Sequence, residues 1–155
     1  MSEAKDRELR ALQGALAAEH AAVYGYGVVG GLIADNRRAD ARAAYDAHRA
    51  RRDTLVREVK DTGAEPVAAA AGYALPFQVP DSPAAVRLAT ELENRVAGVY
   101  ADLVRASGGE RRRVAAEALR EAAVRAVRWG GESVAFPGLA ERAEPSSGAP
   151  STPAV

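Results

Sequence analysis

The fold is decided by the stretch LRALQGALAAEHAAVYGYGVVGGLI, which spans residues 9–33. Its hydrophobic positions recur in steps of three and four without an intervening proline, a pattern typical of an amphipathic α-helix. The positions of this stripe are Leu9, Leu12, Leu16, Glu19, Val23, Tyr26, Gly30 and Ile33. Glu19 is a carboxylate on the face that the pattern buries. Because an unpaired buried charge is strongly unfavourable, we expect Glu19 to contact a positive side chain, a metal ion or strong hydrogen-bond donors.

Three further segments have the same helical pattern. Together with the first, they cover roughly residues 5–34, 38–62, 83–106 and 110–134. The connections at residues 35–36 and 107–109 are short, so the helices on either side of each connection are predicted to pack antiparallel. Asp81, Ser82 and Pro83 are typical of a helix start, because a capping residue precedes a proline in the first turn. The pattern predicts an all-α protein.

The connection between the second and third predicted helices, residues 61–82, is long and contains three prolines and two glycines. A helix of about 25 residues is roughly 37 Å long, and an extended connection of this length could return along it. The third helix would then run parallel to the second, as in an up-down four-helix bundle with one long crossover. We predict one such bundle, ferritin-like in its layout, over residues 1–139 and a disordered tail rich in proline, serine and alanine over residues 140–155.

Composition restricts the classes of function. The chain has 21 basic and 21 acidic residues, so it has no net charge that would attract it to nucleic acid. It has no cysteine, which excludes disulfides, zinc sites with thiolate ligands and thiol nucleophiles. The arginine clusters at residues 49–52 and 111–113 have acids nearby and spread over different helix faces, so we expect no nucleic-acid partner. No apolar run is long enough for a membrane span, and we expect a cytoplasmic protein without membrane contact.

Two arginines are candidate partners for the buried acids. Residues equidistant from a short hairpin turn lie at the same height, and counting from a turn centred near Asn36 places Arg52 level with Glu19. The same count about Gly108 brings Arg125 close to Glu93. We therefore predict a buried ion-pair network of Glu19, Arg52, Glu93 and Arg125, with arginine in the place of a bound cation.

The chain resembles the ferritin-like superfamily, and more closely an uncharacterised actinobacterial ferritin-like domain family, a domain of unknown function. The similar stretches are EHAAVYGY at residues 19–26 and WGG at residues 129–131. The resemblance implies a bundle that can hold iron or manganese. A di-iron site of this superfamily needs four carboxylates and two histidines, one of them on the fourth helix. This chain has two histidines and none on that helix, so a complete di-iron site is excluded.

A reduced metal site remains an alternative. It would comprise Glu19, His48, Glu93 and Glu121 and would bind one iron or manganese ion. Our first expectation is a bundle without a cofactor and without catalytic residues, serving as a structural or interaction domain. Gly27 and Gly31, four apart in the first helix, could let another helix approach closely, within the bundle or in a homodimer. The second candidate function is an atypical metal-binding oxidoreductase or metal-storage protein, and a third is an RNA-associated helical module.

Overall fold

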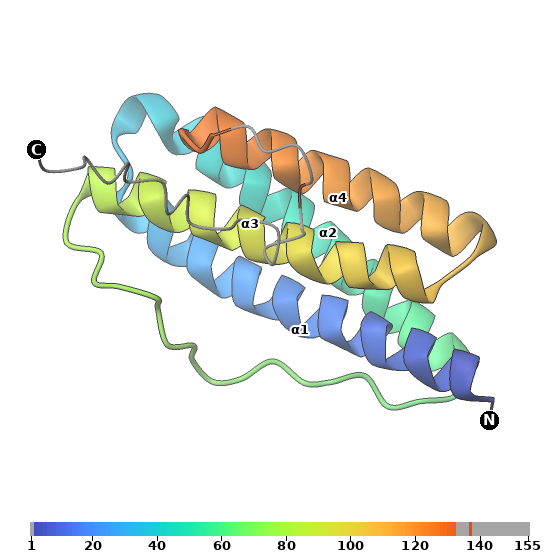
Figure 1. Cartoon of the computed structure of the whole chain (residues 1–155). Helices are drawn as coiled ribbons and strands as arrows, with labels where there is room; N and C mark the ends of the chain where they lie inside the picture. Colours follow the sequence, from blue (N-terminus) through green and yellow to red (C-terminus); the bar gives the residue numbers. More distant parts are fainter. Residues whose placement is uncertain (1, 133–136, 138–155) are drawn as a thin grey trace, which may run out of the picture.

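The protein is an all-α four-helix bundle, as the sequence predicts (Figure 1). The computed structural model describes residues 2–132 and 137, and the predicted tail at residues 140–155 lies outside the described residues. The helices are α1 (Glu3–Leu32), α2 (Arg38–Asp61), α3 (Ser82–Ala106) and α4 (Gly109–Trp129), with a short 3-10 turn, η1 (Asp35–Arg37), before α2. None of these helices is long and apolar enough to cross a membrane.

Local sequence signals set the helix ends. The Asp81 side chain accepts a hydrogen bond from the Ala84 backbone N–H at 2.9 Å, which confirms the predicted start of α3. The last helix ends at Trp129, earlier than the predicted residue 134. Gly130 adopts a left-handed conformation with φ 117°, and the Gly131 N–H turns back to the Ala126 carbonyl at 2.9 Å. Gly130 and Gly131 thus end α4 in a Schellman-type cap. The cap ends the helix although the hydrophobic pattern that predicts a helix continues to residue 134.

The long connection between α2 and α3 runs along the outside of α1, seen in green in Figure 1. Gln13 of α1 holds its first part. The Gln13 side-chain amide donates to the Glu65 carbonyl at 2.7 Å and accepts from the Val67 N–H at 2.8 Å. His20, two turns further along α1, bonds the Val67 carbonyl at 3.1 Å. Because the chain returns along α1 before α3 starts, α3 runs parallel to α2, as the crossover prediction requires.

The interior consists of two hydrophobic clusters with a polar layer between them. The first cluster includes Leu12, Leu16, Leu55, Val59 and Leu103, and the second includes Val29, Ile33, Leu88, Leu92 and Trp129. On α1, α2 and α3 the residues that fall between these clusters are Glu19, His48 and Glu93, all buried. The polar layer therefore interrupts the core at the same height on three helices.

Glycine allows α1 and α3 to approach closely at one position. A Cβ atom on Gly25 would lie 2.6 Å from Leu92 Cδ1, which is closer than carbon atoms pack. Gly27 and Gly31, the pair that the sequence suggested for helix packing, have no neighbouring atom of the described residues within 4 Å of such a Cβ. The close contact within the bundle thus uses Gly25, and Gly27 and Gly31 lie on the exposed side of α1.

Candidate functional site

The centre of the polar layer is a histidine between two carboxylates. His48 Nδ1 lies 2.6 Å from Glu19 Oε2, and His48 Nε2 lies 3.0 Å from Glu93 Oε1. The side chains come from α2, α1 and α3, and none is more than 1% exposed. Because carboxylate oxygens only accept hydrogen bonds, both ring nitrogens donate when both contacts are made. The geometry therefore fits a protonated imidazolium on α2 that bridges α1 and α3.

Two tyrosines complete this arrangement in a reciprocal way. The Tyr26 hydroxyl on α1 donates to Glu93 Oε1 at 2.5 Å, and the Tyr100 hydroxyl on α3 donates to Glu19 Oε1 at 2.6 Å. Each tyrosine follows the glutamate of its own helix by seven residues, which is two helical turns on the same face. Because α1 and α3 run in opposite directions, the tyrosine of each helix reaches the glutamate of the other (Figure 1).

The electrostatics favour the charged form of His48. Burial by itself would lower its pKa, but hydrogen bonds and charges from Glu19 and Glu93 outweigh this and raise the pKa of His48 from 6.5 to about 9. Burial and the neighbouring carboxylates raise the pKa values of the Tyr26 and Tyr100 hydroxyls. At neutral pH the tyrosines are therefore neutral donors and His48 carries a positive charge.

Two arginines and a glutamate border this layer. Arg125 Nη1 on α4 lies 3.8 Å from Glu93 Oε2, an ion pair without a hydrogen bond. That oxygen is buried and has no hydrogen-bond partner among the described residues. Arg51 on α2 donates to Glu121 on α4 at 2.8 Å, and Arg125 lies 3.6 Å from the same carboxylate oxygen. The layer thus contains three carboxylates and, with His48 protonated, three cations, so its net charge is zero.

The predicted contact between Glu19 and Arg52 is not made in the structure. Arg52 donates to its neighbour Asp53 at 2.8 Å and 2.9 Å, and the positive partner of Glu19 is His48. The 3-10 turn runs directly into α2, so the chain reverses near residues 33–34 and not at Asn36. This difference shifts α2 by about one helical turn relative to the expected register. It brings His48, and not Arg52, to the height of Glu19.

The other predicted site residues fall at different distances from the layer. Arg125 lies beside Glu93, as the count from the second turn predicts. Glu121, the fourth residue of the alternative metal set, points to Arg51 and Arg125 at the edge of the layer and not to His48. Sequence reasoning missed Arg51 and the role of Tyr100. The repeated spacing of seven residues between glutamate and tyrosine on α1 and α3 was the signal that could have identified Tyr100.

The donor set fits a metal ion only after rearrangement. Two carboxylates and one imidazole converge, and Glu93 Oε2 has no hydrogen-bond partner among the described residues, which are features of a coordination site. However, both ring nitrogens of His48 are engaged by the carboxylates, so coordination would require the ring to lose a proton and one contact. In the arrangement observed over residues 2–132, no group of three histidine, aspartate or glutamate side chains is placed so that all three could bind one metal ion. The fourth helix contributes Arg125 at the place where another ligand would be needed.

Comparison with known proteins identifies relatives without assigning them a role. No curated protein matches the chain. A crystal structure of a conserved hypothetical protein, Rv2844, from Mycobacterium tuberculosis is similar, with 38% sequence identity and a TM-score of 0.80. The similarity covers 82% of this chain and 90% of the mycobacterial one. The family described as Domain of unknown function (DUF4439) matches residues 11–141. With most of its length matched, this four-helix chain belongs to the DUF4439 family.

Proposed function

We propose that this chain is a ferritin-like bundle in which a self-neutralising polar layer stands in place of a metal centre, and that it acts as a non-catalytic structural or interaction domain. The observation that carries the proposal is the position of His48, whose two ring nitrogens are both bonded to buried carboxylates. An imidazolium held in this way compensates negative charge where a metal ion would otherwise do so. It leaves no ring nitrogen for proton transfer to a substrate.

The tyrosines support the same conclusion. Tyr26 and Tyr100 use their hydroxyl protons on Glu93 and Glu19, and both are buried. A buried network in which nearly every donor and acceptor is satisfied makes the structure rigid and specifies one arrangement of helices. The polar layer connects α1, α2 and α3, so its proposed role is to fix their register.

Elemental analysis of the untagged protein tests this proposal. We expect less than stoichiometric iron, manganese and zinc, and we expect Tm to stay unchanged when iron(II) or manganese(II) is added in excess. A metal that binds only the folded state would raise Tm. Stoichiometric metal that disappears in the variant Glu19→Ala would contradict the proposal. The variant Asp46→Ala, at an exposed position of α2, is the control for non-specific loss of metal.

The second candidate is an atypical iron- or manganese-binding oxidoreductase or storage protein. The buried Glu93 Oε2 favours it, because an oxygen without a hydrogen-bond partner among the described residues is an available ligand next to Glu19 and His48. Glu19, His48 and Glu93 would hold the ion, and Glu121 could join only by leaving Arg51. When bound, the ion would supply Lewis-acid or redox chemistry. The elemental analysis separates this candidate from the first.

We also propose that the interaction role includes a homodimer formed through α1. Gly27 and Gly31 lie on the exposed side of this helix, and no atom of the described chain would contact a Cβ at either position. On the same helix Leu32 is 38% exposed, which is high for a large hydrophobic side chain, and Tyr24 remains 40% exposed while its ring packs against Tyr73 of the connection, with 5.5 Å between ring centroids. Small residues beside exposed apolar ones would let a second helix pack closely on this face.

A further inference from the structure

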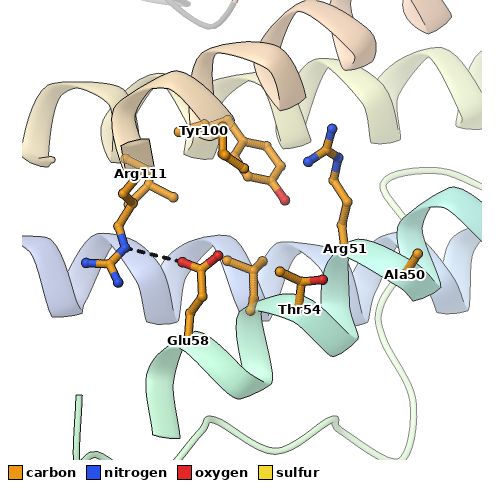
Figure 2. A pocket seen from close by; sticks show the side chains of 10 residues that line it. Ala50, Arg51, Thr54, Glu58, Tyr100 and Arg111 are labelled. Atoms are coloured by element: carbon orange, nitrogen blue, oxygen red, sulfur yellow. Dashed lines mark hydrogen bonds and ion pairs between the residues drawn. The ribbon is translucent and has the colours of Figure 1, made fainter. Parts of the chain in front are cut away.

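A pocket of about 150 Å³ lies between α2 and α4, with α3 at its base (Figure 2). The close backbone contacts of the bundle join α1 to α2, α1 to α3 and α3 to α4, whereas α2 and α4 are bridged by side chains across this pocket. Its apolar wall includes Leu55, Leu103, Val114 and Ala115. Its polar groups are Arg51, Thr54, Glu58, Tyr100 and Arg111.

One end of the pocket has N–H donors that the described chain leaves unused. Arg51 makes one hydrogen bond within the described chain, to Glu121, although a guanidinium has five N–H donors. Glu121 is shared with Arg125, which also lies beside Glu93, so Glu121 occupies only part of the Arg51 guanidinium. Thr54, one turn further along α2, accepts a hydrogen bond from Arg57, and its hydroxyl donates to no acceptor among the described residues. These groups are suited to bind a carboxylate.

The other end has an excess of negative charge. Arg111 donates to Glu58 at 3.2 Å and to Glu8 at 2.7 Å, so one guanidinium faces two carboxylates. In Figure 2 Arg111 and Glu58 lie together on the side of the pocket away from Arg51. The three side chains at this end are largely buried, at 26% to 31% exposed, so water screens their charges only in part. An ammonium group would balance this end.

We propose that this pocket binds a small, elongated zwitterion, with its carboxylate at Arg51 and Thr54 and its ammonium group at Glu58. The buried layer behind Tyr100 is neutral together with Arg51, Arg125 and Glu121, so a ligand with a single negative charge would disturb that balance. A zwitterion is neutral overall; its carboxylate would accept hydrogen bonds from Arg51 and Thr54, and its ammonium group would meet the excess of acid at Glu58. This inference goes beyond the proposed function, since it makes the domain a binding protein for a small molecule.

The size of the pocket limits the ligand. Arg51 and Glu58 are seven residues apart on α2, about 10 Å along the helix axis, and both side chains rise from α2 toward the side of the pocket where Tyr100 and Arg111 lie. A cavity of about 150 Å³ holds a molecule of roughly the size of benzene. An amino acid whose amine and carboxylate are separated by an unbranched chain of a few methylenes meets both conditions. Its methylenes would lie against Leu55, Leu103 and Val114.

Calorimetric or NMR titration of the full chain with three probes tests the proposal. The probes are δ-aminovalerate, valerate and pentylamine, which share the carbon chain and differ in charge. We expect δ-aminovalerate to bind at least about tenfold more tightly than either other probe, since each lost end removes a charge-assisted hydrogen bond. We expect Arg51→Gln and Glu58→Gln each to weaken its binding by a similar factor. In Arg51→Gln its affinity should approach that of pentylamine.

Matched variants distinguish binding from damage to the fold. Arg42→Gln and Asp46→Asn make the same kind of charge change in an exposed pair of α2 away from the pocket and should leave the affinity unchanged. If Arg51→Gln does not fold by circular dichroism, Thr54→Val and the pocket-filling Val114→Phe replace it, and both should weaken binding. No saturable binding of δ-aminovalerate to the wild type would overturn the proposal. Equal binding of valerate or pentylamine, or full affinity in the pocket variants, would overturn it as well.

Discussion

At the scale of single residues, the polar layer depends on Glu19, whose two oxygens have different donors. Oε2 accepts from His48 and Oε1 accepts from Tyr100. Removal of this carboxylate leaves the imidazolium with one counter-charge and a buried hydroxyl without an acceptor. Buried polar groups that lose their partners are among the few causes of large destabilisation by a single substitution.

We therefore expect Glu19→Ala to lower the free energy of unfolding by about 3 to 5 kcal/mol. Denaturation by urea, followed by circular dichroism, measures this change. Asp46→Ala is the matched control, because Asp46 forms an exposed ion pair with Arg42, and its loss should change the stability by less than about 1 kcal/mol. A loss below about 1 kcal/mol for Glu19→Ala would mean that Glu19 is solvated and not part of a buried network.

The protonation of His48 predicts a pH dependence. Its pKa is raised from 6.5 to about 9 in the folded state, so the folded protein binds a proton that the unfolded chain releases. The resulting stabilisation is complete below pH 6.5 and is lost as the pH rises toward about 9. We expect a loss of about 3 kcal/mol across this interval.

Urea denaturation at a series of pH values between 6.5 and 9 measures the dependence of stability on His48. The variant His48→Gln, which cannot take up this proton, should lose most of the slope in this interval. His20→Gln is the control, since His20 bonds the Val67 carbonyl outside the polar layer. A wild-type stability that stays constant or rises over the interval would show that His48 is neutral in the folded protein.

At the scale of elements, the packing of α1 on α3 depends on the absence of a side chain at Gly25. The antiparallel pair must be close at this height for Tyr26 and Tyr100 to reach the glutamates of the opposite helices. Leu92 fills the space beside Gly25, and its Cδ1 atom lies 2.6 Å from the place that an added methyl group would take. A larger residue here would push the two helices apart or displace Leu92 from the core.

Alanine substitutions at two glycines of α1 test whether α1 and α3 approach closely at Gly25. Gly25→Ala should destabilise the protein by about 1 to 3 kcal/mol, because an added methyl group overpacks the helix interface. Gly14→Ala, at another exposed position of the same helix, should stabilise it by up to about 1 kcal/mol through helix propensity. Thermal unfolding of both variants gives the two differences. Equal effects of the two substitutions would contradict a close approach at Gly25.

At the scale of the whole molecule, the exposed side of α1 predicts the oligomeric state. Sedimentation velocity of the wild type should show a homodimer. Gly31→Leu should shift it toward the monomer, because a large side chain prevents a second helix from packing closely on this face. Gly14→Leu is the control, as Gly14 is also exposed on α1, and no atom of the described residues lies within 4 Å of an added Cβ. A wild type that is monomeric at all concentrations would exclude the dimer.

The architecture could be read from the sequence because its signals are local. Hydrophobic periodicity, the Asp81 cap and the length of residues 61–82 predict four helices and one crossover, and the structure confirms them. The burial of Glu19 could likewise be predicted from one helix, because Glu19 follows Leu16 by three residues and precedes Tyr26 by seven, which places all three on the same face.

The partner of that carboxylate was decided only by the tertiary structure. Which residue of α2 stands level with Glu19 depends on where the chain reverses, and a change of two or three residues at the turn replaces Arg52 by His48. Periodicity determines which face of a helix is buried, but it carries no information on how far one helix slides along another. The connection and the packing of side chains across the interface determine that distance, and with it the chemistry of the buried layer.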